Sequence, residues 1–213
     1  MTKLLLVRHG ESEANLIKAF AGHYNAKLTD LGRLQAKAAA ERIKKEYNIT
    51  KVYASDLSRA FDTGKAIAEA SGVPIVPNSS LREIMAGKWE GRLIDELLVE
   101  FEKDYGLWRT DIGNATCTDG EAVTDLLKRV IKALEDIAKA HSGEEIAIAT
   151  HATPIRATQS FVEKGSLCEM KNVTWPLNAS ISVLEYEDGK WSFSLISSDD
   201  HLENIKSLIP ANV

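Results

Sequence analysis

Cysteine and long hydrophobic runs are scarce in this sequence. The 213 residues include only Cys117 and Cys168, which are too few for a disulfide framework and lack metal-ligand spacing, so we expect free thiols. No apolar run approaches the roughly 18 residues of a membrane helix. The apolar run before Arg8 is four residues long, whereas a signal peptide needs about 7 to 15. These features predict a cytoplasmic protein.

A block of basic residues is also missing. The formal net charge is −5 and the pI is about 5.6, and Lys44-Lys45 is only a pair. Nucleic acid and anionic membranes are therefore not expected as partners. The length fits one domain with a full core and at most one inserted subdomain. Any bound anion must then contact a local cluster of cations.

A short hydrophobic run near the N-terminus ends in a compact set of reactive groups. Residues 4–7 predict a strand buried on both faces, and Arg8, His9 and Gly10 follow it directly. Ligands of open α/β sheets bind at the carboxyl ends of strands. Arginine offers paired donors to phosphate, a neutral imidazole can attack phosphorus, and glycine permits close backbone approach. Taken alone, the three residues equally fit a surface loop after a buried strand.

The rest of the chain alternates predicted strands with predicted helices. Strands are expected at 51–55, 74–77 and 145–150, and helices at 29–47, from 56 to about 71, at 93–105, at 122–141 and from 154 to about 164. Segments 180–186 and 191–196 predict a hairpin, while 81–91 and 106–120 are expected to be an ordered loop and an irregular segment. This pattern predicts an α/β three-layer sandwich with a mostly parallel central sheet, helices on both faces and the C-terminal β-hairpin at the sheet edge.

Individual residues mark the helix ends. Thr29 is the expected N-cap of the 29–47 helix, and Ser55 or Asp56 is the expected cap of the next one. Gly72 is a natural stop for that second helix. Gly32 is a poor helix former, which leaves open a close backbone approach at that position.

Further cationic and imidazole groups follow two other predicted strands. Arg59 comes shortly after the strand at 51–55, and His151 directly follows the strand at 145–150. Because parallel strands present their carboxyl ends at one edge of a sheet, these side chains should join Arg8 and His9 there. Each of these residues alone could be a surface arginine or a structural histidine. That explanation would have to hold after all three predicted strands at once. One shared anion site is therefore favoured.

At these positions the chain resembles the histidine phosphatase superfamily, which includes the cofactor-dependent phosphoglycerate mutases. The resemblance runs from Leu4 to about Arg156, and more loosely to the C-terminal tail. Its anchors, in order, are Arg8-His9-Gly10-Glu11-Ser12 with Asn15, Leu28-Thr29-Asp30-Leu31-Gly32-Arg33-Leu34-Gln35-Ala36, Ser55-Asp56-Leu57-Ser58-Arg59-Ala60, Glu83, Gly87-Lys88-Trp89-Glu90-Gly91 and His151.

The resemblance implies a role for each matching residue. The catalytic set is His9, Glu83, Arg8, Arg59 and His151, with His9 as the nucleophile that carries the phosphoryl group on Nε2 and Glu83 as the proton donor to the leaving oxygen. The substrate-binding set is Arg8, Ser12, Asn15, Ala21, Gly22, Arg59, Glu83, His151 and Ala152. Neither a metal nor a cofactor is implied. Apart from the resemblance, Glu83 also fits a surface carboxylate paired with Arg82 or Lys88.

The sequence departs from the family pattern in two places. Ala152-Thr153 follows His151 where many members have Gly-Gly, although Ala152 can still offer its N–H if its φ is negative. Residues 117–121 stand where relatives often have a Pro-Gly-Gly-Glu-Ser-like segment. Because of this second departure, the shape of the substrate rim cannot be carried over from the family.

Two features favour a phosphatase over a mutase. The region 101–121 lacks the arginine pair of mutases, and Trp89-Glu90-Gly91 resembles the corresponding loop of phosphatase members. We therefore predict hydrolysis of a small phosphorylated metabolite through a phosphohistidine. The alternatives are a cofactor-dependent phosphoglycerate mutase and a weakly active interaction protein that binds phosphorylated ligands.

The predicted organisation is a single domain over 1–213, with 84–121 as a substrate-rim or lid insertion. Met85, Trp89, Leu93, Leu107 and Trp108 fit either an apolar rim or part of the core. The oligomeric state is left open, with a dimer among the options.

Overall fold

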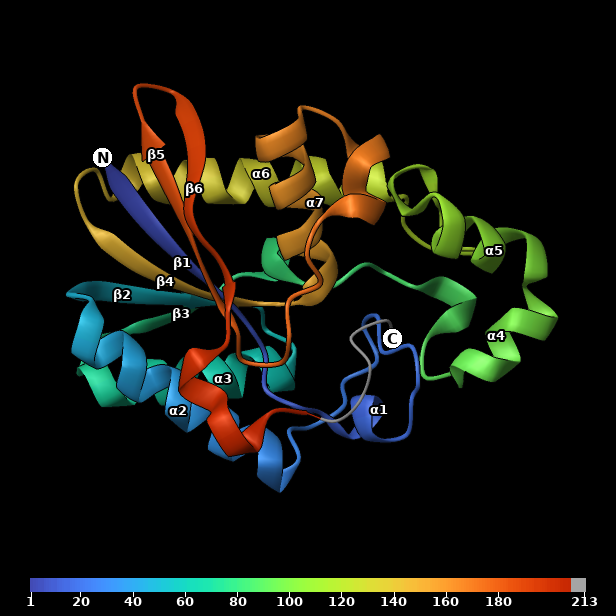
Figure 1. Cartoon of the computed structure of the whole chain (residues 1–213), viewed down its shortest axis with the longest axis horizontal. Coiled ribbons are helices and arrows are strands. Elements are labelled where there is room, and N and C mark those ends of the chain that lie inside the picture. Colours follow the sequence, from blue (N-terminus) through green and yellow to red (C-terminus); the bar gives the residue numbers. More distant parts are fainter. Residues whose placement is uncertain (208–213) are drawn as a thin grey trace.

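Six strands form one mixed sheet in the computed structural model, which describes residues 1–207 (Figure 1). The strand order is β3-β2-β4-β1-β5-β6. The parallel strands are β1 (Thr2–Arg8), β2 (Ile49–Ala54), β3 (Ile75–Pro77) and β4 (Glu145–Thr150), and the hairpin is β5 (Ile181–Glu187) with β6 (Lys190–Ser198). The mostly parallel sheet with the hairpin at its edge is confirmed.

Helices cover both faces of this sheet (Figure 1). One face carries α2 (Asp30–Glu46) and α3 (Ser58–Ser71), and the other carries α6 (Val123–Ala140) and α7 (Ala152–Lys164). Along β1, Leu5 and Val7 pack into the cluster with α2 and α3, whereas Leu4 and Leu6 pack with α6 and α7. Successive strand side chains point to opposite faces, so a continuous apolar run is what this covered strand requires.

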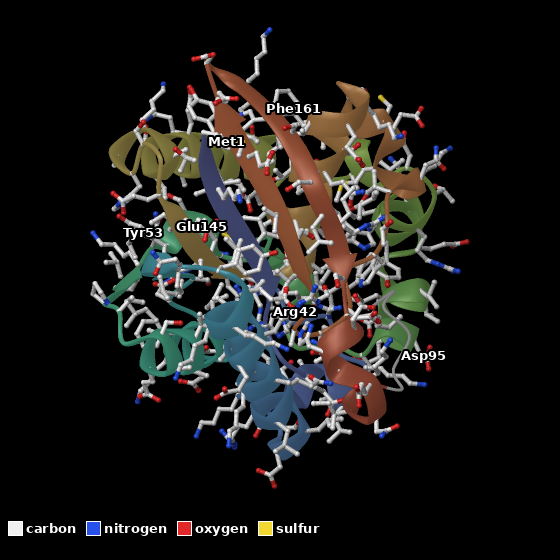
Figure 2. All side chains as sticks on the ribbon, turned by 60° about the vertical axis from the view of Figure 1, so that its left-hand side comes forward. Met1, Arg42, Tyr53, Asp95, Glu145 and Phe161 are labelled. Carbon is white, nitrogen blue, oxygen red and sulfur yellow. The ribbon has the colours of Figure 1, made fainter. Side chains whose placement is uncertain are left out.

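The amino ends of the parallel strands lie together, away from the predicted site. Lys3 of β1 is in register with Glu145 of β4, and Figure 2 shows Met1 and Glu145 at the same end of the sheet. The carboxyl ends of β1, β2 and β4 therefore share the opposite end. That end faces the segment between β3 and α6 (Figure 1).

Two of the predicted helix-end signals are confirmed and one is wrong. Thr29 Oγ1 accepts a hydrogen bond from Gly32 N at 3.0 Å, and Gly72 ends α3 with a φ of 69°. The N-cap of α3 is Leu57, without a side-chain hydrogen bond. Ser55 and Asp56 do not cap this helix because their side chains bond to the ring of His151 and to Arg82 instead.

The loop after β1 lies directly against the first turn of α2. A Cβ atom at Gly32 would lie 2.0 Å from the carbonyl oxygen of Glu11, and one at Gly10 would lie 2.2 Å from that of Gly32. Such distances are far below van der Waals contact, so both positions require glycine. The close approach at Gly32 is confirmed, and it fixes the backbone just beyond His9.

The segment between β3 and α6 differs from the prediction. In place of one helix over 93–105 and an irregular stretch over 106–120, α4 (Ile94–Glu100) and α5 (Glu102–Thr110) meet at a bend at Phe101. The bend lets Leu97, Tyr105 and Trp108 enter the same core cluster. Trp89 is fully buried and Trp108 is nearly so, which makes them core, whereas Met85, Leu93 and Leu107 are exposed.

Shorter helical segments complete the described chain. They are α1 (Glu13–Leu16) and 3-10 helices at Ser79–Leu81, Gly87–Trp89, Ile112–Asn114, Leu167–Asn172 and Asp200–Ile205. Both cysteines are free, as expected. Within residues 1–207, no helix combines the length and the apolar character needed to span a bilayer.

Candidate active site

His9 lies at the carboxyl end of β1 with its ring in a defined state. Its Nδ1 is 2.7 Å from the carbonyl oxygen of Gly10, which can only accept, so Nδ1 carries the proton and Nε2 the lone pair. Arg59 Nε donates to that Nε2 at 3.3 Å. Burial, and then the charges of Arg59 and Arg8, hold the pKa of His9 well below its ordinary range. The ring is thus a neutral imidazole whose Nε2 carries an electron pair and no proton, which is the nucleophilic form.

Arg59 stands in the first turn of α3 and is fully buried. Its Nη1 donates to the carbonyl of Tyr24 at 2.9 Å, and its Nη2 donates to that of Gly22 at 2.8 Å. These bonds fix the guanidinium plane against the loop that follows α1. Burial lowers the pKa of Arg59 to about 10, so the group remains a cation at neutral pH.

Arg8, the last residue of β1, supplies a second buried cation. Its Nη1 donates to the carbonyl of Pro176 at 2.7 Å. Its Nε is buried and has no hydrogen-bond partner within the described part of the chain. Burial lowers the pKa of Arg8 to about 10, and the nearby Glu83 carboxylate partly offsets this.

His151 is the N-cap residue of α7 and packs edge-on against His9, with ring centroids 5.2 Å apart. Its Nε2 is 2.8 Å from the hydroxyl of Ser55, which directly follows β2. Burial, followed by the charge of Arg59, holds the pKa of His151 well below its usual value. Two neutral imidazoles and two guanidinium groups therefore meet at this sheet edge, as predicted.

Glu83 faces the same pocket from the loop after β3. Its Oε1 accepts from the N–H of Ile84 at 2.9 Å, and its Oε2 accepts from the N–H of Thr153 at 3.3 Å. The surface alternative fails, because Arg82 pairs with Asp56 and Lys88 pairs with Asp119. The carboxylate thus lies at the N-terminus of α7, in the pocket that His9 also lines.

A cavity of about 30 Å³, here called the phosphoryl pocket, connects these groups. Eight predicted residues line it: Arg8, His9, Asn15, Ala21, Gly22, Arg59, Glu83 and Ala152. Ala152 is the first residue of α7 and has no positive φ, so its N–H can serve an anion there. His151 is not in the lining, and its ring packs against that of His9. Ser12 is not in the lining, and instead its hydroxyl bonds to Asn15 Oδ1 at 3.0 Å as the N-cap of α1.

Arg129 of α6 was not predicted as a site residue, but its hydrogen bonds hold the loop that carries Glu83. Its Nε and Nη2 donate to the Glu121 carboxylate at 2.7 and 2.9 Å. Its Nη1 donates to the carbonyls of Ser80 and Arg82, both at 2.9 Å, and its Nη2 also donates to that of Glu83 at 2.8 Å. An arginine on an amphipathic helix is usually solvated, and its position beside the apolar stripe is the only sequence signal.

Asn178, just before β5, is a second residue without a sequence signal. Its Nδ2 donates to the His9 carbonyl at 3.0 Å and to Asn15 Oδ1 at 3.2 Å. Because Asn15 Oδ1 accepts from both Asn178 and Ser12, the NH₂ group is the end of the Asn15 amide that is left for the pocket this residue lines. Over residues 1–207, no three His, Cys, Asp or Glu side chains gather as a metal site.

Comparison with known proteins agrees with this arrangement. The chain is 34% identical over 206 residues to phosphoglycerate mutase-like protein 4 of Arabidopsis thaliana, covering 94% of this chain and 87% of that protein. It is 32% identical over 207 residues to the metal-independent phosphoserine phosphatase of the same plant, covering 96% and 85%. The structure of Bacillus stearothermophilus YhfR superposes with a TM-score of 0.90 at 24% identity, over 95% of this chain and 100% of that one.

The family model described as histidine phosphatase superfamily (branch 1) matches residues 4–199. That span includes all the motifs on which the sequence resemblance rests, from Arg8-His9-Gly10 to His151. The chain belongs to the histidine phosphatase superfamily.

Proposed function

We propose that this protein hydrolyses phosphomonoesters through a phosphohistidine formed on His9. The observation that carries the proposal is the 2.7 Å contact between His9 Nδ1 and the Gly10 carbonyl. It leaves the Nε2 electron pair at the pocket that Arg8, Arg59 and Glu83 also line. A binding protein for phosphorylated ligands would need neither a nucleophile nor an acid there.

In the first step, His9 Nε2 attacks phosphorus and the ester P–O bond breaks. Arg8 and Arg59 stabilise the charge on the equatorial oxygens, aided by the N–H of Ala152 at the start of α7. Glu83 takes up the proton that the phosphomonoester monoanion carries and gives it to the leaving alkoxide oxygen. Such general acid catalysis typically contributes ~10²–10⁴-fold in rate. The alcohol departs and phosphohistidine remains.

In the second step, water attacks the phosphohistidine from the face that the alcohol has left. Glu83, now a carboxylate, takes the proton from that water. The N–P bond breaks, and His9 returns to a neutral imidazole whose Nδ1–H still bonds to Gly10. The products are the alcohol and inorganic phosphate, so the protons balance over the cycle.

Metal independence belongs to the same proposal. Two buried arginines already supply the positive charge that a metal ion would bring to the phosphoryl group. The name of the metal-independent Arabidopsis relative supports this view. No cofactor is required by the two steps. A small phosphorylated metabolite fits as substrate, since relatives include a phosphoserine phosphatase.

Mutase activity is the second candidate, favoured by the name of the other Arabidopsis relative. The region 101–121 supplies Arg109 but no arginine pair to hold a phosphoglycerate for transfer between its two oxygens. We therefore place hydrolysis first. We also propose that residues 84–121 form the substrate rim, since Trp108 of α5 lines the phosphoryl pocket.

One experiment distinguishes hydrolysis from mutase activity and from binding without turnover. The protein is incubated with 3-phosphoglycerate, phosphoserine and p-nitrophenyl phosphate, and both inorganic phosphate and isomerised product are measured. Hydrolysis predicts phosphate release that His9→Ala abolishes. Isomerisation of 3-phosphoglycerate without phosphate release would establish the mutase instead, and no turnover of any ester would favour the interaction protein.

A further inference from the structure

A second, larger cavity adjoins the phosphoryl pocket. Its volume is about 410 Å³, and Trp108 lines both spaces. Cavities that hold small organic ligands measure roughly 300–1,000 Å³, so this one is large enough for the alcohol part of an ester. Its walls come from α4 and α5 on one side and from α7 with the 3-10 helix Leu167–Asn172 on the other (Figure 1).

The charged groups of this cavity are all of one sign. Arg109, Arg156 and Lys171 line it, and no Asp or Glu among the described residues does. In the part of the chain that the structure covers, none of the three forms an ion pair. The protein as a whole carries a net charge of −5. The cavity is therefore a local positive site on an acidic protein, which favours an anion.

Arg156 and Trp175 form the inner wall. The guanidinium carbon of Arg156 lies 4.2 Å from the centre of the Trp175 ring, and its Nη2 donates to the carbonyl of Met170 at 2.8 Å. Arg156 is only 6% exposed. Arg156 Nε and Trp175 Nε1 are both buried and without a hydrogen-bond partner in residues 1–207. Buried donors are almost always paired, so this wall carries hydrogen-bonding capacity that the described chain itself does not use.

We propose that this cavity binds the leaving group and selects phosphomonoesters whose alcohol part carries a carboxylate on a planar or apolar body, without an ammonium group. The inference rests on the proposed phosphatase function and adds its substrate class. The carboxylate accepts from the cationic wall, and the body lies between the Trp108 and Trp175 side chains. An ammonium group is disfavoured because no carboxylate of the described chain lines the cavity to pair with it.

Three aryl phosphates with matched leaving groups test this selection. They are 4-methylphenyl, 4-(carboxymethyl)phenyl and 4-(aminomethyl)phenyl phosphate, in which a methylene separates the charge from the ring. Hydrogen bonds to charged groups contribute about 1.5–3 kcal/mol, so kcat/KM for the carboxymethyl ester should exceed that of the methyl ester roughly ten- to a hundredfold. The aminomethyl ester should be the poorest of the three.

Substitutions of the three cationic side chains then test whether they cause the preference for the carboxymethyl ester. The double variant Arg109→Gln/Lys171→Gln changes two exposed side chains. It should lower the ratio of kcat/KM for the carboxymethyl ester to kcat/KM for the methyl ester several-fold. Adding Arg156→Gln should lower this ratio further. Lys190→Gln, at the exposed first residue of β6, is the matched control and should leave the ratio as it is. The exposed double variant keeps the test valid even if Arg156→Gln does not fold.

The outcomes distinguish the two proposals. The cavity assignment is overturned if kcat/KM is about equal for the carboxymethyl and methyl esters in the unmodified protein. It is also overturned if the double variant leaves that ratio unchanged. In either case, hydrolysis of the methyl ester still supports the phosphatase function. Failure to hydrolyse any of the three esters overturns the phosphatase function and the cavity assignment with it. Phosphoserine supplies a second comparison, because it should be a poorer substrate than its analogue without the amine, 3-phosphooxypropanoate.

Discussion

Arg129 Nη2 donates to the backbone carbonyl of Glu83 at 2.8 Å, and this bond ties the proposed acid to helix α6. His23 Nε2 contacts the same carbonyl oxygen at 2.9 Å. The Glu83 backbone is thereby held from two sides, while its carboxylate is left to face His9. Catalysis at this site should depend on that geometry as well as on the carboxylate itself.

Arg129→Gln should therefore weaken catalysis, although Arg129 does not line the phosphoryl pocket. Because the guanidinium bridges three carbonyls and the Glu121 carboxylate, its loss should displace Glu83 and reduce kcat on alkyl phosphates by about 10²-fold. On p-nitrophenyl phosphate, whose phenolate leaves without a proton, the first-turnover rate should fall much less. Lys128→Gln, at the exposed neighbouring position, is the control. Equal loss on both substrates would indicate general unfolding instead of mispositioning.

A phosphoenzyme should accumulate on His9 during turnover. Because phosphohistidine is labile in acid and stable in base, quenching a reaction with labelled ester into base should retain the label on the protein, and later acid treatment should release it. His9→Ala should carry none. Full labelling of His9→Ala would show that another residue is the nucleophile.

Hydrolysis should survive removal of divalent cations. The charge at the phosphoryl pocket comes from Arg8 and Arg59, whose pKa values of about 10 keep them protonated at neutral pH. The rate in millimolar EDTA should match the untreated rate. Loss of activity that returns on adding Mg²⁺ or Zn²⁺ would contradict the metal-independent mechanism.

Glu83→Gln and Arg59→Ala should affect different parts of the reaction. Glu83→Gln removes the proton donor and should slow alkyl phosphates far more than p-nitrophenyl phosphate, measured on the first turnover before phosphohistidine breakdown limits the rate. Arg59→Ala removes a contact to the transferred group, so it should slow both substrates alike, by ~10²–10³-fold. Equal slowing of the two esters by Glu83→Gln would rule it out as the leaving-group acid.

Protein stability should fall in mildly acidic solution because of buried neutral histidines. The pKa values of His9 and His151 are held below their ordinary values by burial, so the unfolded chain binds more protons as pH falls below about 6.5. The free energy of unfolding should then drop by up to about 1.4 kcal/mol per pH unit for each histidine. Urea titrations between pH 7 and 5 measure the slope, which His151→Asn should reduce.

The sheet, its apolar strands and the group of side chains at its carboxyl edge could all be predicted from the sequence. Strand β1 is readable because a sheet covered on both faces needs a continuous apolar run, and His9 follows it with no intervening residue. Arg59 and His151 stand just past the ends of β2 and β4. Parallel strands bring such positions to one edge, so the assembly follows from the strand pattern alone.

The hydrogen-bond partners of the polar side chains could be identified only in the folded chain. Ser55 is a reasonable helix cap from its sequence neighbours, yet its hydroxyl bonds to His151, 96 positions away. Arg129 holds Glu83 from 46 positions away, and Asn178 holds His9 from 169 positions away. Hydrophobic periodicity fixes which face of an element is buried, but a hydrogen-bond partner depends on which groups the packed elements bring opposite one another. The bend at Phe101 and the cationic cavity arise in the same way, since only packing brings α4, α5 and α7 together around Trp108.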